Sequence, residues 1–208
     1  MPRKPRDGSW GAGGDSVAER PELAIKIAVV ANTWTSIEGH MAYALGAMIG
    51  ADHRVALAIL TKIQTATAKS QMIQAVGKAA LDARLQPGLE NLLRSFNRLA
   101  PRRNKVIHVL WGISDAEPAG LLWLPPDAPN RISLGLMAAM TTGSATELIG
   151  DIQSEYELWE AADFDDLNAD LAQLASEFIS FAVKMQGLTI AKAGGLDAEK
   201  IISQMSKW

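Results

Sequence analysis

The feature that most constrains this chain is a run of apolar residues toward its C-terminal end, spaced by three and four positions in alternation. The run consists of Phe164, Leu167, Leu171, Leu174, Phe178, Phe181 and Met185. This spacing puts all of them on one narrow stripe of an α-helix, and such a stripe packs against other helices. The sequence therefore predicts a long helix, ended by Gly187, with its apolar seam in a helical bundle.

Two further helices are predicted in the first half of the chain. The first begins at Pro21 and ends at Gly50. Its apolar stripe consists of Leu23, Ile27, Val30, Trp34, Ile37, Met41, Leu45 and Met48. Asp52 is a suitable N-cap for the second helix, which extends to about Leu81 with a break near Ser70.

A third helix is predicted after a turn at Pro87 and Gly88, with an apolar stripe from Leu89 to Leu110 and Trp111 on the next positions. The helical spacing then stops between 120 and 136. Two short apolar stretches, 120–124 and 131–136, flank a segment with three prolines. We expect a two-stranded β-hairpin or an ordered loop here, because proline confines strands to short edge pairing. The predicted fold class is all-α: an antiparallel bundle of four to five helices with one short insertion.

The domain organisation follows from this pattern. Residues 1–20, rich in glycine and proline, are predicted to form a flexible tail, and 21–187 the bundle. Residues 188–208 are predicted to form a C-terminal extension with a short helix capped by Asp197. With 208 residues, 48% of them apolar, one domain can bury a substantial core. No apolar run reaches the ~18 residues that span a membrane, and no secretory signal is recognisable, so we expect a cytoplasmic protein without membrane contact.

The composition removes several kinds of chemistry. The chain has no cysteine, which excludes disulfides, thiolate zinc sites and thiol nucleophiles. It has three histidines, too few for a histidine-rich metal site, and no glycine-rich loop of the type that binds nucleotides. The acidic residues Asp165, Asp166 and Asp170 are interpreted as a solvated helix face rather than a metal site. We therefore expect no metal and no cofactor.

The formal charge of −3 is the sum of two opposed blocks. Residues 84–108 hold six lysines and arginines against one acid, a net +5, whereas 147–177 hold ten acids and no lysine or arginine, a net −10. Such blocks are usually solvated helix faces, but they can also pair within the fold or between subunits. Within the basic block, Arg94, Arg98 and Arg102 recur every fourth residue and form a basic stripe.

Arg103 lies on the apolar stripe of the third helix, at a position where the spacing predicts an apolar residue. A guanidinium there is costly unless a carboxylate, a phosphate or an interface partner satisfies it. Asn104 and His108 are four residues apart and lie on one edge of the same face, with Trp111 beside them. The helix would thus present a cation, an amide and an imidazole together. Glu38 on the first helix is a candidate carboxylate partner for Arg103.

The string from Arg103 to His108, R-N-K-V-I-H, resembles the R-x4-6-H signature of the HEPN superfamily, including the polar residue directly after the arginine. The resemblance covers 21–187 in general helical character and this motif in specific letters. It implies a four- or five-helix bundle that dimerises, so that the motifs of two subunits face a shared cleft. It also implies a metal-independent endoribonuclease of the toxin–antitoxin, abortive-infection or RNA-processing type, with a protein antitoxin or regulator as a possible partner.

The chemistry of such a site is coherent with these residues. His108 would act as general base or acid while the 2′-hydroxyl of the RNA attacks the phosphodiester. Arg103 would hold the scissile phosphate, and Asn104 would orient His108 or donate to a phosphate oxygen. The remaining RNA contacts are predicted from the basic stripe, Lys105 and Trp111.

Two alternatives stay open. In the first, the chain is a non-catalytic bundle that binds RNA or protein and keeps the motif as a structural element. In that case Arg103 pairs with a bundle carboxylate and His108 and Trp111 are packing residues. A small-molecule pocket within the bundle is a third hypothesis, and His40 and His53 are expected to be surface or packing residues.

Overall fold

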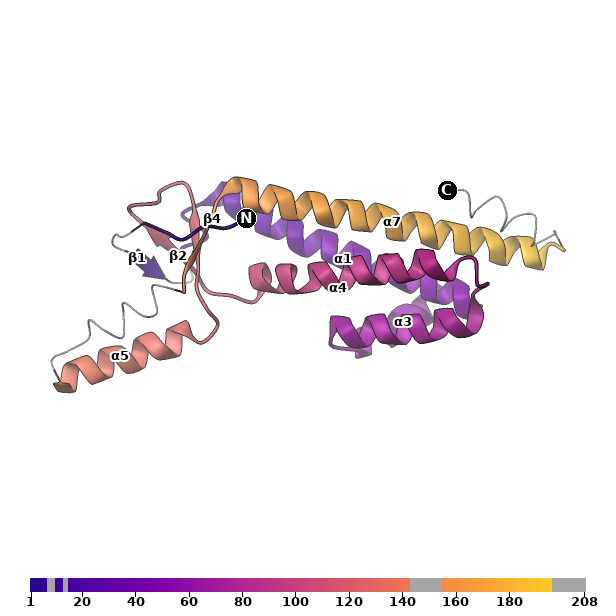
Figure 1. The fold of residues 1–208 in the computed structure, drawn as a ribbon, viewed down its shortest axis with the longest axis horizontal. Coiled ribbons are helices and arrows are strands. Elements are labelled where there is room, and N and C mark those ends of the chain that lie inside the picture. Colours follow the sequence, from indigo (N-terminus) through magenta and orange to yellow (C-terminus); the bar gives the residue numbers. More distant parts are fainter. Residues whose placement is uncertain (7–9, 13–14, 143–154, 196–208) are drawn as a thin grey trace. The chain divides into compact units, whose positions relative to one another are not determined.

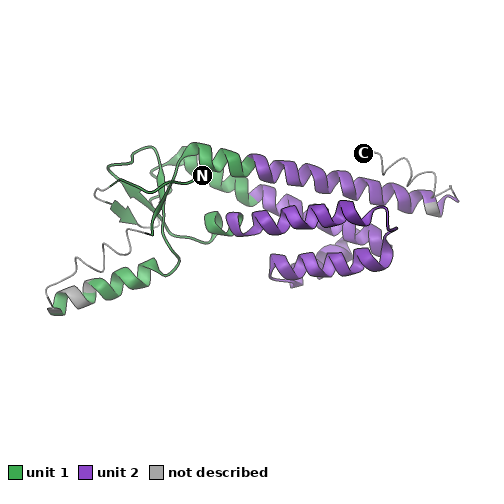
Figure 2. Ribbon diagram, viewed as in Figure 1, with its two compact units in different colours: residues 1–31, 103–168 green, residues 32–102, 169–208 purple. Residues whose placement is uncertain are grey.

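The computed structural model describes residues 1–6, 10–12, 15–142 and 155–195 (Figure 1). The chain is mostly helical and carries a small antiparallel sheet. It forms two compact units: unit 1 comprises 1–31 and 103–168, and unit 2 comprises 32–102 and 169–208 (Figure 2). Three long helices contribute residues to both units, namely α1 (Pro21–Ile49), α4 (Gln86–Ile107) and α7 (Ala161–Ala193).

Helices α2 (His53–Lys62) and α3 (Ala66–Ala80) belong to unit 2. The predicted end of α1 is confirmed, because Gly50 adopts a left-handed φ of +67° directly after its last residue. Asp52 caps α2 as predicted, since its carboxylate accepts the backbone N–H of Arg54. The break before α3 comes earlier than the predicted one near Ser70, because the Thr65 hydroxyl accepts the N–H of Ala68 and starts a new helix.

The core of unit 2 is made of the predicted helical stripes. The buried side chains on α1, α4 and α7 include Trp34, Ile37, Met41, Leu45, Leu92, Leu93, Phe96, Leu171, Leu174, Phe178 and Met185. The ring of Phe96 stacks on Trp34 at 4.7 Å between centroids and meets Phe178 edge-on at 6.3 Å. Helix α7 does not end at Gly187 as predicted, because buried Leu188 and Ala191 continue the seam to Ala193. The first residues of the predicted C-terminal extension therefore belong to α7, and the short helix predicted after Asp197 lies outside the described residues.

Unit 1 contains a four-stranded antiparallel sheet, which is more than the one short hairpin that the predicted all-α fold included. The strands, in spatial order, are β1 (Trp10–Ala12), β2 (Trp111–Ser114), β3 (Leu121–Trp123) and β4 (Glu157–Trp159). Residues 1–20, predicted to be a flexible tail, supply β1 and also a bridge from Arg3 to Leu158. Two or three residue pairs per ladder define the register, with Trp111 opposite Trp123 and Leu122 opposite Leu158.

The predicted insertion is half correct. Its first stretch holds β3, but β3 pairs with β2 and β4, whereas 131–136 lies in helix α5 (Ala128–Thr142). Pro129 is the second residue of α5, and backbone N–H groups in the first turn of a helix have no acceptor within that helix. Proline is therefore tolerated here, and this segment begins a helix instead of a hairpin. Pro87 and Gly88, predicted to be a turn, occupy the first turn of α4 for the same reason.

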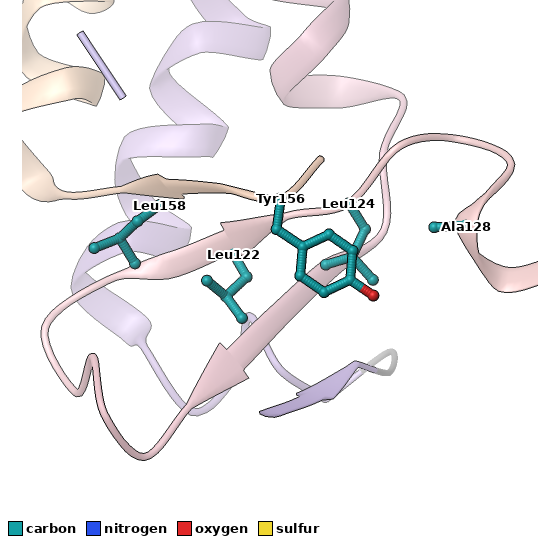
Figure 3. Close-up of a cluster of buried hydrophobic side chains, with 5 residues drawn as sticks. All are labelled: Leu122, Leu124, Ala128, Tyr156 and Leu158. Carbon is teal, nitrogen blue, oxygen red and sulfur yellow. The ribbon is translucent and has the colours of Figure 1, made fainter. Parts of the chain in front are cut away.

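One face of the sheet is covered by an apolar cluster (Figure 3). Its buried members are Leu122, Leu124, Ala128, Tyr156 and Leu158. Trp10 of β1 packs edge-on against the Tyr156 ring, with 5.0 Å between the ring centroids. This contact packs the N-terminal strand against the cluster. Burial raises the pKa of the Tyr156 hydroxyl to about 12.

The described helices were also compared with the requirements of a bilayer. Taken singly, none of them is both long and apolar enough to cross a membrane. Helices α1 and α2 meet the requirement as a pair, with a bend of 120° between them.

Candidate functional site

The candidate site lies where α4 ends. The helix stops at Ile107, so the prediction that it continues through Leu110 and Trp111 is wrong. Two indole N–H groups end it: that of Trp123 donates to the Lys105 carbonyl at 2.8 Å and that of Trp111 to the Val106 carbonyl at 3.3 Å. Carbonyls that a helix leaves unbonded are thereby satisfied from the sheet of the same unit.

The three predicted catalytic residues are close together at this helix end. One guanidinium nitrogen of Arg103, Nη1, lies 3.0 Å from Nε2 of His108 and donates to Oδ1 of Asn104 at 3.1 Å. The backbone N–H of His108 donates to the carbonyl of Asn104 at 3.0 Å, so the last helical turn carries the imidazole although it lies outside the helix. The motif therefore forms one contiguous polar cluster.

The contact between Arg103 and His108 selects one tautomer of the imidazole if it is a hydrogen bond. A guanidinium can only donate hydrogen bonds, so a hydrogen bond at 3.0 Å requires Nε2 to accept and the ring proton to lie on Nδ1. In this tautomer Nε2 has the lone pair that a general base needs. His108 and Asn104 are exposed to solvent, and Arg103 is half-buried.

Lys105 faces the sheet from the same helix end. Its ammonium pairs with Glu157 of β4 at 2.6 Å and lies 4.3 Å from the centroid of the half-buried Trp123 ring. Both contacts hold the lysine within unit 1, and the pair with Glu157 joins the basic and the acidic blocks. Lys105, predicted to contact RNA, would have to exchange this carboxylate for a phosphate.

The predicted basic stripe belongs to unit 2 and is also paired there. Arg102 lies 2.5 Å and Arg98 3.8 Å from the same carboxylate oxygen of Asp170 on α7, and Arg94 donates to Asn91. The opposed charge blocks thus pair within the fold, which is one of the arrangements that the sequence left open. An Asp170 carboxylate between two arginines lowers the positive charge that the stripe presents to a phosphate backbone.

Trp111, predicted to contact RNA, and Glu38, predicted to pair with Arg103, have different neighbours in the structure. Trp111 is 5% exposed and packs against Trp159 and Phe164, with ring centroids 6.0 and 5.6 Å away, so it is a core residue of unit 1 and offers no face to a base. In unit 2, Glu38 accepts hydrogen bonds from buried Lys69 at 2.7 Å and from the Trp34 indole at 3.0 Å. A pairing of Glu38 with Arg103 stays a prediction.

Two of the three acidic residues considered for a metal site are engaged with cations of the chain. Asp165 pairs with Lys26 in unit 1, and Asp170 with the two arginines in unit 2. Among the described residues, no three histidine or carboxylate side chains are close enough to hold a metal ion together.

The sequence raises a small-molecule pocket as a third hypothesis, but it does not identify the residues that line the cavity in unit 2. These include His40 and His53, which the sequence predicts to be surface or packing residues. One sequence feature could have indicated this cavity. The two histidines lie on either side of Gly50, where two apolar helices meet at a sharp turn.

Comparison of the chain with protein-family models, with curated proteins and with solved structures gives no match in any of the three. The assignment of a function therefore rests on the residues and their geometry.

Proposed function

We propose that this protein is a HEPN-like, metal-independent endoribonuclease whose site consists of Arg103, Asn104 and His108. The observation that carries the proposal is the 3.0 Å contact between Arg103 Nη1 and His108 Nε2 beside an exposed imidazole. A guanidinium and an imidazole at contact distance are the two groups that metal-free cleavage of RNA requires. The proposal includes the antiparallel bundle arrangement and the cytoplasmic location expected for such an enzyme.

The reaction follows from these atoms. A scissile phosphate that enters the cluster draws the Arg103 guanidinium away from His108, because a guanidinium bonds a phosphate more strongly than a neutral imidazole. Nε2 of His108 is then free to accept the proton of the 2′-hydroxyl as that oxygen attacks phosphorus. The bond from phosphorus to the 5′-oxygen breaks, and the products are a 2′,3′-cyclic phosphate and a 5′-hydroxyl that takes up a proton.

We further propose that two copies share the cleft, so that a second imidazole protonates the leaving 5′-oxygen. His108 is the single histidine of this cluster, and one imidazole that has just accepted a proton cannot also serve as an independent acid in the same step. A protein antitoxin or regulator that covers the exposed imidazole would act as an inhibitor.

The test is cleavage of structured and single-stranded RNA by the purified protein in EDTA. We expect cyclic-phosphate products and a loss of rate of about 10²–10⁴-fold in His108→Ala, as for other positioned acid–base groups. His53→Ala is the matched control, because His53 is also an exposed histidine and lies in unit 2. A substrate with 2′-deoxyribose at the cut site must resist cleavage. Equal rates for wild type and His108→Ala would refute the catalytic proposal.

One observation favours a second candidate, a non-catalytic bundle that keeps the motif structurally. The pairing of Arg98 and Arg102 with Asp170 and the burial of Trp111 remove predicted RNA contacts. The salt dependence of RNA binding separates the two candidates, because phosphate contacts weaken steeply as salt rises. Binding of RNA that is independent of salt, or no binding at all, would favour the structural interpretation of the motif.

A further inference from the structure

Unit 2 contains a cavity of about 570 Å³ between α1, the start of α2 and α7. Its volume falls within the ~300–1,000 Å³ that is usual for small-molecule sites. None of the residues assigned to the proposed ribonuclease site lines it. The cavity is thus a second candidate site with its own chemistry.

The turn between α1 and α2 creates the cavity. Gly50 reverses the chain with its φ of +67°, and a Cβ at Gly46 would lie 3.0 Å from the Ala51 carbonyl oxygen. The absence of a side chain at Gly46 therefore lets α2 start close to α1. On the opposite wall, Ala182 of α7 contributes a single methyl group, and these small residues leave the space open.

An aromatic pair forms one side of the cavity. The rings of Tyr43 and His53 stack at 4.6 Å between centroids with 12° between their planes. Both rings are exposed and both line the cavity, so the stack stands at its mouth. Ile179 and Val183 of α7 line the aliphatic side. A flat aromatic ligand fits between such walls, because it can extend the stack and cover the aliphatic side chains.

The polar groups of the cavity favour an uncharged ligand. Burial lowers the pKa of His40, so this imidazole is neutral at neutral pH and can donate or accept a hydrogen bond. Gln186 supplies an amide. Among the described lining residues the charged one is Asp52, and its carboxylate is bound by Arg54 through two nitrogens at 3.0 and 3.1 Å. An anion would meet this carboxylate, and a cation would find it already neutralised.

We propose that this cavity binds an uncharged, planar heteroaromatic molecule that stacks on the Tyr43–His53 pair and hydrogen-bonds to His40 or Gln186. The proposal does not depend on the ribonuclease activity, because it uses different residues and a different kind of ligand.

The experiment is a fluorescence titration of the full-length protein with Nile red, an uncharged planar dye. Nile blue is a cationic dye with a related ring system and serves as the charged comparison. We expect saturable binding of one Nile red per chain and binding at least tenfold weaker for Nile blue. Equal affinity for the two dyes would overturn the assignment of an uncharged ligand.

Two matched variants locate the site. Val183 lines the cavity and is 65% exposed, whereas Ile190 on the same helix is 64% exposed and lies outside it. Val183→Asp should weaken Nile red binding about tenfold or more, and Ile190→Asp should leave it unchanged. Both positions are exposed, so both variants should keep the wild-type circular dichroism and melting temperature.

A third variant tests the aromatic wall. Tyr43→Ala should weaken Nile red binding about three- to tenfold, which is the expected loss of one aromatic stack. An equal effect of Val183→Asp and Ile190→Asp, or an unchanged affinity in Tyr43→Ala, would overturn the proposal. A change of sedimentation from dimer to monomer in Val183→Asp would also overturn it and would identify the surface as a subunit interface.

Discussion

Unit 2 and unit 1 bury their apolar side chains in different ways. Unit 2 has its core on long helices, where most buried residues follow another buried residue three or four positions earlier. Unit 1 has a sheet whose strands hold three or four residues each and come from four separate stretches between 10 and 159. The residues of a helical core can therefore be recognised from their local spacing in the sequence. This sheet, in contrast, depends on contacts between residues that are distant in sequence.

The two units also differ in how they tolerate change. A helical seam loses stability mainly when a large side chain is removed, because the cavity that remains is costly. Short strands are held together by backbone hydrogen bonds. Their stability therefore falls when an added atom pushes two neighbouring strands apart. The four changes that follow test this contrast, from the largest expected effect to the smallest.

The largest effect is expected for Phe178→Ala in the seam of unit 2. Phe178 is fully buried and meets Phe96 edge-on, so truncation should lower the free energy of unfolding by about 3–5 kcal/mol. The measurement is urea denaturation followed by circular dichroism. Ile179→Ala, the neighbouring exposed position, is the control and should cost much less. Equal losses for the two variants would show that the seam does not carry the stability of unit 2.

A smaller effect, about 1–3 kcal/mol, is expected for Gly112→Ala in the sheet of unit 1. A Cβ at this position would lie 2.8 Å from the Gly11 carbonyl oxygen and 3.1 Å from Leu124, so β1 would have to move away from β2. Gly11→Ala on the partner strand is the control, because its Cβ meets nothing within 4 Å. Hydrogen exchange at Trp10–Ala12 should rise in Gly112→Ala and stay unchanged in Gly11→Ala.

The sequence predicts the helices well for a physical reason. Apolar spacing identified the residues of the α1 and α7 seams, and the local signals at Gly50 and Asp52 located the turn between α1 and α2. The strands could not be predicted in the same way. A strand of three residues is too short to show alternation, and its partner lies far away in sequence.

The candidate site shows the same division. The sequence places Arg103, Asn104 and His108 within about one and a half helical turns, and their hydrogen bonds agree with that placement. It could not show that the helix stops at Ile107 or that Trp111 belongs to a buried strand. Both follow from the sheet, because the indoles of Trp111 and Trp123 bond the last carbonyls of α4.

Acid titration tests how the N-terminal segment is held in unit 1. Arg3 donates to both carboxylate oxygens of Glu117 at 2.9 Å, and this holds the pKa of Glu117 at about 2, below its ordinary 4.5. A lowered folded-state pKa means that the contribution is complete above about pH 4.5 and is lost as the pH falls toward 2. Glu117→Gln should flatten the dependence of unfolding on pH in this window.

The matched control for this titration is Glu90→Gln, on the exposed surface of α4 in unit 2. It should keep the wild-type dependence on pH. If Glu117→Gln and wild type lose stability in parallel between pH 4.5 and 2, the ion pair with Arg3 contributes nothing to unit 1.

The smallest effect has the opposite sign and is expected at Gly39 in the middle of α1. A Cβ there meets nothing within 4 Å, and the backbone is helical, so Gly39→Ala should stabilise the protein by about 0.5–1 kcal/mol through the lower entropy of the unfolded chain. Gly46→Ala on the same helix is the contrast, because its Cβ would press on the Ala51 carbonyl at 3.0 Å. Thermal unfolding should rank the proteins Gly39→Ala, wild type, Gly46→Ala. If Gly46→Ala instead stabilises the protein, the turn into α2 can shift to make room for the added Cβ. In that case the close approach of α2 to α1 does not require a glycine at position 46.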